Sequence, residues 1–194
     1  MSRQRTLGEY RAIDLTLFCI ILIIFESILH TAATKLFPAE PYSVLLVASI
    51  TAIVMMRWGL YAAIHAVIGG ITYCVLSNGT FQHYLIYGIG NLFALLAMFL
   101  LKAWGKEEVR KDGIKSVAFA LLVQLLMQFG RCIVATALRF PLSTGLAFFT
   151  TDIISDLFTV VIIWIARRLD GIFEDQRHYL IRIQSETEKD KGTY

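Results

Sequence analysis

The charged residues of this 194-residue chain are confined to a few short segments, and the segments between them are apolar. Charged residues make up only 17% of the chain and gather in the first eleven residues, in residues 102–115 and in the last thirty residues. A soluble domain distributes its charges over its surface, whereas a chain in a bilayer keeps them out of the hydrocarbon region. A helix crosses that region with roughly 20 residues. The intervening segments are long enough, so the sequence predicts an integral membrane protein.

Composition agrees with this prediction, and the turn residues divide the chain. Hydrophobic residues make up 57% of the chain and the mean hydropathy is +0.64, against about 45–50% apolar residues in soluble domains. Pro38 and Pro41, Asn78-Gly79 and Pro141 mark turns. We therefore expect an all-α membrane protein, a compact bundle of six transmembrane helices. The predicted helices are residues 12–34, 43–56, 59–76, 81–102, 114–138 and 144–168.

The basic residues predict the orientation of this bundle. If the N-terminus is cytoplasmic, fifteen of the 18 Lys and Arg residues lie in cytoplasmic segments, only Lys35 and Arg139 lie outside, and Arg131 lies within a helix. This asymmetry satisfies the positive-inside rule, and an even number of helices places the C-terminus inside as well. We expect residues 1–168 to form the transmembrane domain of a plasma-membrane protein of bacterial type. Residues 169–194 would form a cytoplasmic tail, either an interfacial helix or a frayed polar segment, with residues 186–194 disordered.

Ionisable and amide side chains within the predicted helices are the candidate functional residues. Burying an ionisable group at a helix centre in a membrane costs roughly 2.5–3.5 kcal/mol on insertion scales, so such a residue needs a partner, a cavity or a function. Polar side chains recur at helical spacing in several helices, and each set forms one stripe. The sets are Glu26 and His30; Tyr84, Tyr87 and Asn91; Gln124, Gln128 and Arg131; and Asp152 and Asp156.

These stripes lie at matching depth in the outer half of the predicted bundle, which favours a polar cavity open to the outside. Aromatic rings with a few polar groups are a usual lining for a small-molecule site, and Tyr84 and Tyr87 are the aromatic candidates. A purely structural interpretation stays open, in which Arg131 pairs with Asp152 or Asp156 and locks two helices together. One arginine does not neutralise three carboxylates, so a ligand or a proton is expected to meet the remaining charge.

Several function classes lack their signatures in this chain. It contains no nucleotide-binding GxxxxGK[ST] loop, and no HExxH, GxSxG or CxxC motif. We therefore expect no enzyme activity and no cofactor or metal in this chain. The formal net charge of +3 reflects a basic cytoplasmic rim that suits anionic lipid headgroups, so we expect lipid contacts and no nucleic-acid partner.

Two stretches carry a resemblance to a known family. The segment PYSVLLVASITAIVMMRWGLYAAIHAVIGG, residues 41–70, is similar to the second helix, the short basic turn and the Gly/Ala-rich third helix of the substrate-binding S components of energy-coupling factor (ECF) transporters. Tyr87-Gly-Ile-Gly-Asn91 resembles the fourth helix of that family. The resemblance in layout covers nearly the whole chain.

This resemblance implies a high-affinity binding subunit for a vitamin or similar micronutrient. Its partners would be a transmembrane scaffold subunit and two ABC-type ATPases, which use the ATP. Ala12 and Thr16 stand where the family has an Ala-x-x-x-Ala docking pair, with threonine replacing the second alanine. Two alternatives remain: a structural membrane scaffold without a ligand, similar to MreD, or a small ion-coupled carrier that works alone.

Overall fold

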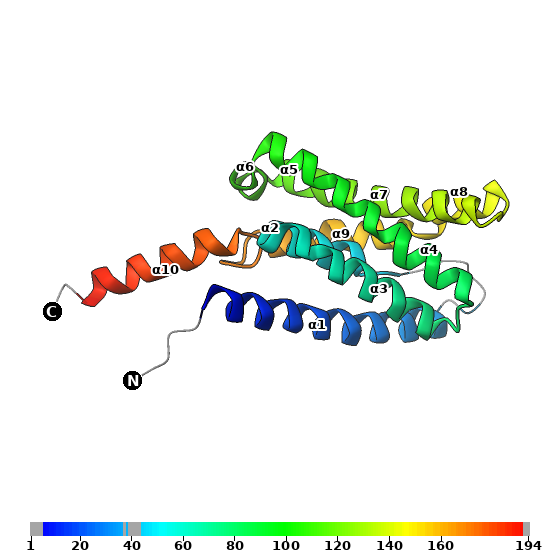
Figure 1. Ribbon diagram of the computed structural model, residues 1–194, viewed down its shortest axis with the longest axis horizontal. Helices are drawn as coiled ribbons and strands as arrows, with labels where there is room; N and C mark the ends of the chain where they lie inside the picture. Colours follow the sequence, from blue (N-terminus) through cyan, green and yellow to red (C-terminus); the bar gives the residue numbers. More distant parts are fainter. Residues whose placement is uncertain (1–5, 37, 39–43, 192–194) are drawn as a thin grey trace.

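The computed structural model describes residues 6–36, 38 and 44–191, and every regular element within these ranges is a helix (Figure 1). The start predicted for the second helix, Ser43, lies outside the described residues, as do Pro41 and residues 192–194. The helices, with η for 3-10 helix, are α1 Leu7–Leu36, α2 Val47–Trp58, η1 Gly59–Tyr61, α3 Ala62–Leu76, α4 Phe81–Asn91, η2 Leu92–Ala97, α5 Met98–Trp104, α6 Lys106–Lys111, α7 Gly113–Ala137, α8 Leu142–Thr151, α9 Ile153–Ala166 and α10 Gln176–Lys191.

Four helical stretches in the described ranges are long and apolar enough to cross a membrane, and five if α8 and α9 count as one bent span. One of the four, Val47–Leu76, is not straight. A Cβ atom on Gly69 would lie 2.6 Å from the Val47 side chain, whereas 22 residues of straight helix separate two positions by about 33 Å. Gly59, at a φ of 64°, lies where α2 folds back into α3. The stretch is therefore a hairpin, as the sequence predicted, with arms of 12 and 15 residues.

Legs that follow one another along the chain run in opposite directions. Leu46, just before α2, contacts Glu26 in the second half of α1, and Arg57 at the end of α2 contacts Asp14 near the start of α1. The same antiparallel relation holds between α3 and α4, between α4 and α7, and between α7 and α9. The described ends of the chain, the start of α1 and α10, consequently lie at the same end of the bundle (Figure 1).

Helix α2 is the centre of this arrangement. Every residue from Val47 to Arg57 is buried, and α2 packs against α1, α3, α7 and α9. A helix that is apolar all round belongs in such an interior position. In contrast, α1 exposes a continuous apolar stripe along its outer side, and each of its residues is about half exposed: Ile13, Leu17, Ile20, Ile24 and Ile28.

Two predicted helices are interrupted. The helix expected over residues 81–102 changes to the tighter 3-10 form at Leu92, directly after Gly90, where α4 approaches the backbone of α7 most closely. The single helix expected over residues 144–168 is two helices, bent by 41°. This break falls at Asp152, whose carboxylate pairs with Arg131 of α7. Local packing at a buried polar residue thus overrides the uniform apolar pattern.

The C-terminal tail, for which an interfacial helix and a frayed segment were both left open, contains helix α10 in its described part. Phe173, Glu174 and Gln176 are buried against the end of the bundle, and Arg57 donates to the carbonyl oxygens of Gly171 and Ile172. Residues 186–191, expected to be disordered, continue α10. Side-chain pairs four residues apart, such as Arg182 and Glu186, support such a helix. Figure 1 shows α10 projecting beyond the bundle near the start of α1.

Candidate functional site

Arg131 of α7 is the centre of a buried polar cluster. Its Nη1 donates to Oδ2 of Asp152 at 2.6 Å, and its Nε donates to Oδ1 of Asn91 on α4 at 2.8 Å. The side chains of Arg131 and Asp152 are 1% and 0% exposed. A charged pair so far from water is stable only when its remaining donors and acceptors are satisfied. Asn91 accepts one of the remaining hydrogen bonds that Arg131 can donate.

Asn91 extends the network to α3. Its Nδ2 donates to the carbonyl oxygen of Ala66 at 3.0 Å, so one side chain bridges α3 and α7. Gly70 makes the room for it, because a Cβ at this position would lie 2.9 Å from Asn91 Nδ2 and 2.7 Å from the carbonyl oxygen of Tyr87. The small residues of α3 therefore position a polar side chain as well as allowing close helix packing.

Glu26 of α1 meets the same cluster with one oxygen unused. Its Oε2 accepts a hydrogen bond from the backbone N–H of Leu46 at 2.9 Å, and the side chain is fully buried. The charges of both Arg131 and Asp152 act on it. Its Oε1 has no hydrogen-bond partner in the described part of the chain, so a buried acceptor faces the cluster unsatisfied.

The two glutamines of α7 behave differently from each other. Gln128 donates from Nε2 to Oδ1 of Asp156 on α9 at 3.3 Å. Gln124, one turn away, is 1% exposed, and neither its Nε2 nor its Oε1 has a partner among the described residues. An unsatisfied buried polar group costs about 1–3 kcal/mol, and an ordered water, an ion or a ligand is the usual explanation for one.

Aromatic rings cover one side of the cluster. The guanidinium carbon of Arg131 lies 4.6 Å from the centre of the Tyr87 ring, a cation–π geometry. Tyr87 also contacts Phe148 and Tyr73, with ring centres 5.9 and 4.7 Å apart. His30 reaches this group only through Tyr73, at 5.9 Å. Tyr84, which was predicted beside Tyr87, is half-buried against the apolar core.

Tyr73 is the residue that the sequence interpretation missed. It lies on the face of α3 that also carries Ala66 and Gly70, at the spacing i, i+4 and i+7. From the sequence, this helix was noted only as the Gly/Ala-rich segment of the family resemblance. A tyrosine in line with a small-residue stripe was the available signal, since the stripe brings a neighbouring helix within reach of the ring.

The remaining predicted sites lie apart from this cluster. Ala12 and Thr16 are exposed on α1, in the region of its outer apolar stripe. Asp14 points the other way and pairs with Arg57 at 2.6 Å, and it also accepts from the indole N–H of Trp58. His65 Nε2 lies 3.1 Å from the carbonyl oxygen of Leu15 and 3.4 Å from Cys19 Sγ.

Within residues 6–36, 38 and 44–191, no group of three or more His, Cys, Asp or Glu side chains is placed to hold a metal ion. Chemically, the cluster offers an arginine, carboxylates, amides and aromatic faces. These groups can bind and orient a small polar molecule. Comparison with known proteins gives no match to a family model, to a curated protein or to a solved structure.

Proposed function

We propose that this chain is the non-catalytic, membrane-embedded substrate-binding subunit of an ECF-type importer and that its ligand binds in the buried polar cluster. The observation that carries the proposal is a set of buried polar atoms on α1 and α7 that lack a hydrogen-bond partner in the described chain. Glu26 Oε1 and both polar atoms of the Gln124 amide are buried without a partner in the described chain. Gln124 is carried by the same helix as Arg131, and the charges of Arg131 and Asp152 act on Glu26. A ligand that donates a hydrogen bond to Glu26 and bonds to the Gln124 amide would remove the free-energy cost of these unsatisfied groups.

Membrane placement is part of the proposal. The six alternating legs would each cross the bilayer, with both termini in the cytoplasm. The short α2 is compatible with this because it is buried by its neighbours and need not match the thickness of the lipid. The apolar stripe of α1 would face lipid or a scaffold subunit, and Ala12 and Thr16 lie there for docking.

The ligand class follows from the groups that are present. A flat ring would stack on Tyr87 or Tyr73, and polar substituents would meet Gln124 and Glu26, which describes a small, polar, partly aromatic nutrient such as a vitamin. The family mechanism implied by the resemblance is capture outside and tipping of the whole subunit to release the ligand inside. ATP hydrolysis by partner ATPases would drive it.

A second candidate function has an observation of its own. The chain of hydrogen bonds from Ala66 through Asn91 and Arg131 to Asp152 joins α3, α4, α7 and the bend between α8 and α9. An interhelical lock of this kind is what a ligand-free scaffold similar to MreD would need. In that case the cluster stabilises the fold and binds nothing.

A ligand-dependent thermal shift separates the two functions. The purified full-length chain in detergent is heated with each member of a panel of vitamins and their precursors. The importer proposal predicts stabilisation by one compound, because ligand binding to the folded state at 100 times Kd adds about 2.7 kcal/mol. The Gln124→Leu variant should fold and show a clearly smaller shift at the same ligand concentration. A panel without any shift would favour the scaffold.

A further inference from the structure

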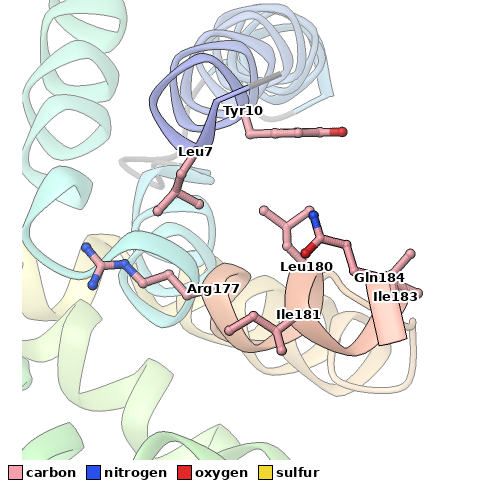
Figure 2. Close-up of a pocket in the computed structure, with 7 residues that line it drawn as sticks. All are labelled: Leu7, Tyr10, Arg177, Leu180, Ile181, Ile183 and Gln184. Atoms are coloured by element: carbon pink, nitrogen blue, oxygen red, sulfur yellow. The ribbon is translucent and has the colours of Figure 1, made fainter. Parts of the chain in front are cut away.

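Two adjoining cavities open at the end of the bundle that carries the termini. The larger is an apolar groove of about 390 Å³ between the start of α1 and α10 (Figure 2). Leu7 and Tyr10 line it from α1, and Leu180, Ile181 and Ile183 line it from α10. Leu7 and Ile181 remain 41% and 64% exposed. The groove is therefore apolar, accessible and only partly filled by the protein itself.

The second cavity is a smaller hollow of about 180 Å³ with a basic lining. It lies between the hairpin turn at Gly59, the start of α6 and the segment before α10. Its charged residues are Arg11, Arg57, Lys106, Arg177 and Asp175. Arg177 lines both cavities. Figure 2 shows its stem beside the groove while its guanidinium group points away from the apolar residues.

The charges of this hollow do not balance. Arg57 is paired with Asp14, and Lys106 with Asp175. Arg11 stacks on the ring of Tyr61, with 4.2 Å between its Cζ and the ring centre. For Arg11 and Arg177, no carboxylate partner exists in the described part of the chain. Two positive charges therefore lie in the hollow that adjoins the apolar groove, without a carboxylate partner among the described residues.

We infer that the two cavities together bind one anionic phospholipid, with its phosphate between Arg11 and Arg177 and an acyl chain in the groove of Leu7 and Ile181. A lone anion would leave the groove empty, and the cationic ammonium group of a zwitterionic lipid would be repelled by the two arginines. Tyr10 and Tyr61, each about 40% exposed at this level, suit the headgroup region of a bilayer. This inference depends on the proposed membrane placement and not on the transport function.

The bound lipid also has a defined structural consequence. Its phosphate would join α1 to the first turn of α10, two segments that face each other across the groove. The lipid would therefore fix α10 along the membrane surface, as expected for an interfacial helix. Without it, the ion pairs of Arg182 with Asp170 and Glu174 join α10 to the segment before it.

The test uses the full-length protein in detergent with phosphatidylglycerol, with phosphatidylcholine of the same acyl chains, and with inorganic phosphate. Thermal shift gives the affinity, and native mass spectrometry gives the number of lipids retained. We expect saturable stabilisation by phosphatidylglycerol alone, with one lipid per chain. Replacing both arginines (Arg11→Gln with Arg177→Gln) should weaken binding about thirtyfold, the effect of removing two basic residues from an anionic lipid.

A control variant removes the same charge from the same end of the bundle. Lys102→Gln with Lys111→Gln changes two basic residues that line neither cavity, and it should leave the affinity unchanged. Leu7→Ser with Ile181→Ser alters only the groove, and it should weaken phosphatidylglycerol binding while the arginines are intact. Equal loss in the lysine control would overturn the inference in favour of diffuse attraction. An equal shift with inorganic phosphate would overturn it in favour of a simple anion site.

Discussion

Arg131 and Asp152 form an ion pair of 2.6 Å in which neither side chain is more than 1% exposed. Arg131 comes from the middle of α7, and Asp152 lies at the bend between α8 and α9. This pair fixes the depth at which the last leg meets the rest of the bundle. It also determines which other polar groups, Asn91 above all, lie within hydrogen-bond reach.

Removing one member of this pair should be much more damaging than removing both. Arg131→Met leaves Asp152 buried without its counter-charge, and we expect a loss of about 3–5 kcal/mol in the free energy of unfolding. Combining Arg131→Met with Asp152→Leu should recover a large part of it. Denaturant unfolding of the single and double variants in detergent measures the coupling. Strictly additive losses would contradict a direct pair.

Two glycines of α4 provide a matched pair for testing the crossing of α4 and α7. A Cβ on Gly90 would lie 2.7 Å from the backbone of Arg131, whereas a Cβ on Gly88 would meet nothing within 4 Å. Gly90→Ala should lower the free energy of unfolding by about 1–3 kcal/mol through overpacking. Gly88→Ala should raise it by about 0.5–1 kcal/mol, because alanine favours the helix. Equal effects in thermal unfolding would argue against this crossing.

The packing of the segment before α10 against the bundle should depend on the guanidinium group of Arg57. This group donates twice to Asp14, at 2.6 and 2.8 Å, and also to the carbonyl oxygens before α10. Lysine keeps the charge but not the planar fork. We expect Arg57→Lys to speed tryptic cleavage after Arg177 severalfold, with Arg139→Lys at the opposite end as a control. An unchanged rate would show that α10 is held by other contacts.

The contact of Lys106 with Asp175 should make the packing of the segment before α10 sensitive to acid. Burial alone raises the pKa of Asp175, but the hydrogen bond and positive charge of Lys106, 2.7 Å away, outweigh it, so the pKa lies below its ordinary value of 3.8. The stabilisation is therefore complete above that value and is lost as the pH falls through the lower pKa of the folded state. Both side chains are partly exposed, so added salt should weaken the effect.

The measurement for this prediction is the rate of proteolysis between pH 5 and pH 2, with an acid-tolerant protease in place of trypsin. Cleavage near α10 should accelerate in the acid range in the native sequence. Lys106→Met should show faster cleavage already at pH 5 and little further change. The same pH profile in both proteins would exclude this ion pair as the cause.

The sequence predicted the helical legs well where apolar runs are long and bounded by turn residues. Residues 114–138 were expected and α7 spans Gly113–Ala137, and the hairpin of α2 and α3 was expected at the glycine where it occurs. Spacing also identified Asn91, Arg131 and Asp152 as neighbours in depth. The pairing of Arg131 with Asp152, left open against Asp156, is now a contact of the structure.

Other features depend on contacts between distant segments that spacing along one helix does not reveal. No proline marks the break at Asp152 or the 3-10 segment after Asn91 in the sequence. The segment before α10 is bonded at Gly171 and Ile172 by Arg57, more than a hundred residues earlier, and its buried Glu174 pairs with Arg110. His30 and Tyr84 were predicted with the cluster from helical spacing, yet His30 meets it only through Tyr73.

The affinity of the panel compound that gives the largest thermal shift, measured for the native sequence and for Gln124→Leu, tests the central claim most directly. Leucine removes the unsatisfied amide without breaking the contact of Arg131 with Asp152, and Phe129→Leu on the exposed side of α7 is the control. Loss of one hydrogen bond to the ligand, about 1.4 kcal/mol, corresponds to a tenfold higher Kd. We predict at least this increase for Gln124→Leu and none for Phe129→Leu. Equal Kd values in all three proteins, or no saturable binding in any of them, would contradict a ligand site in the polar cluster.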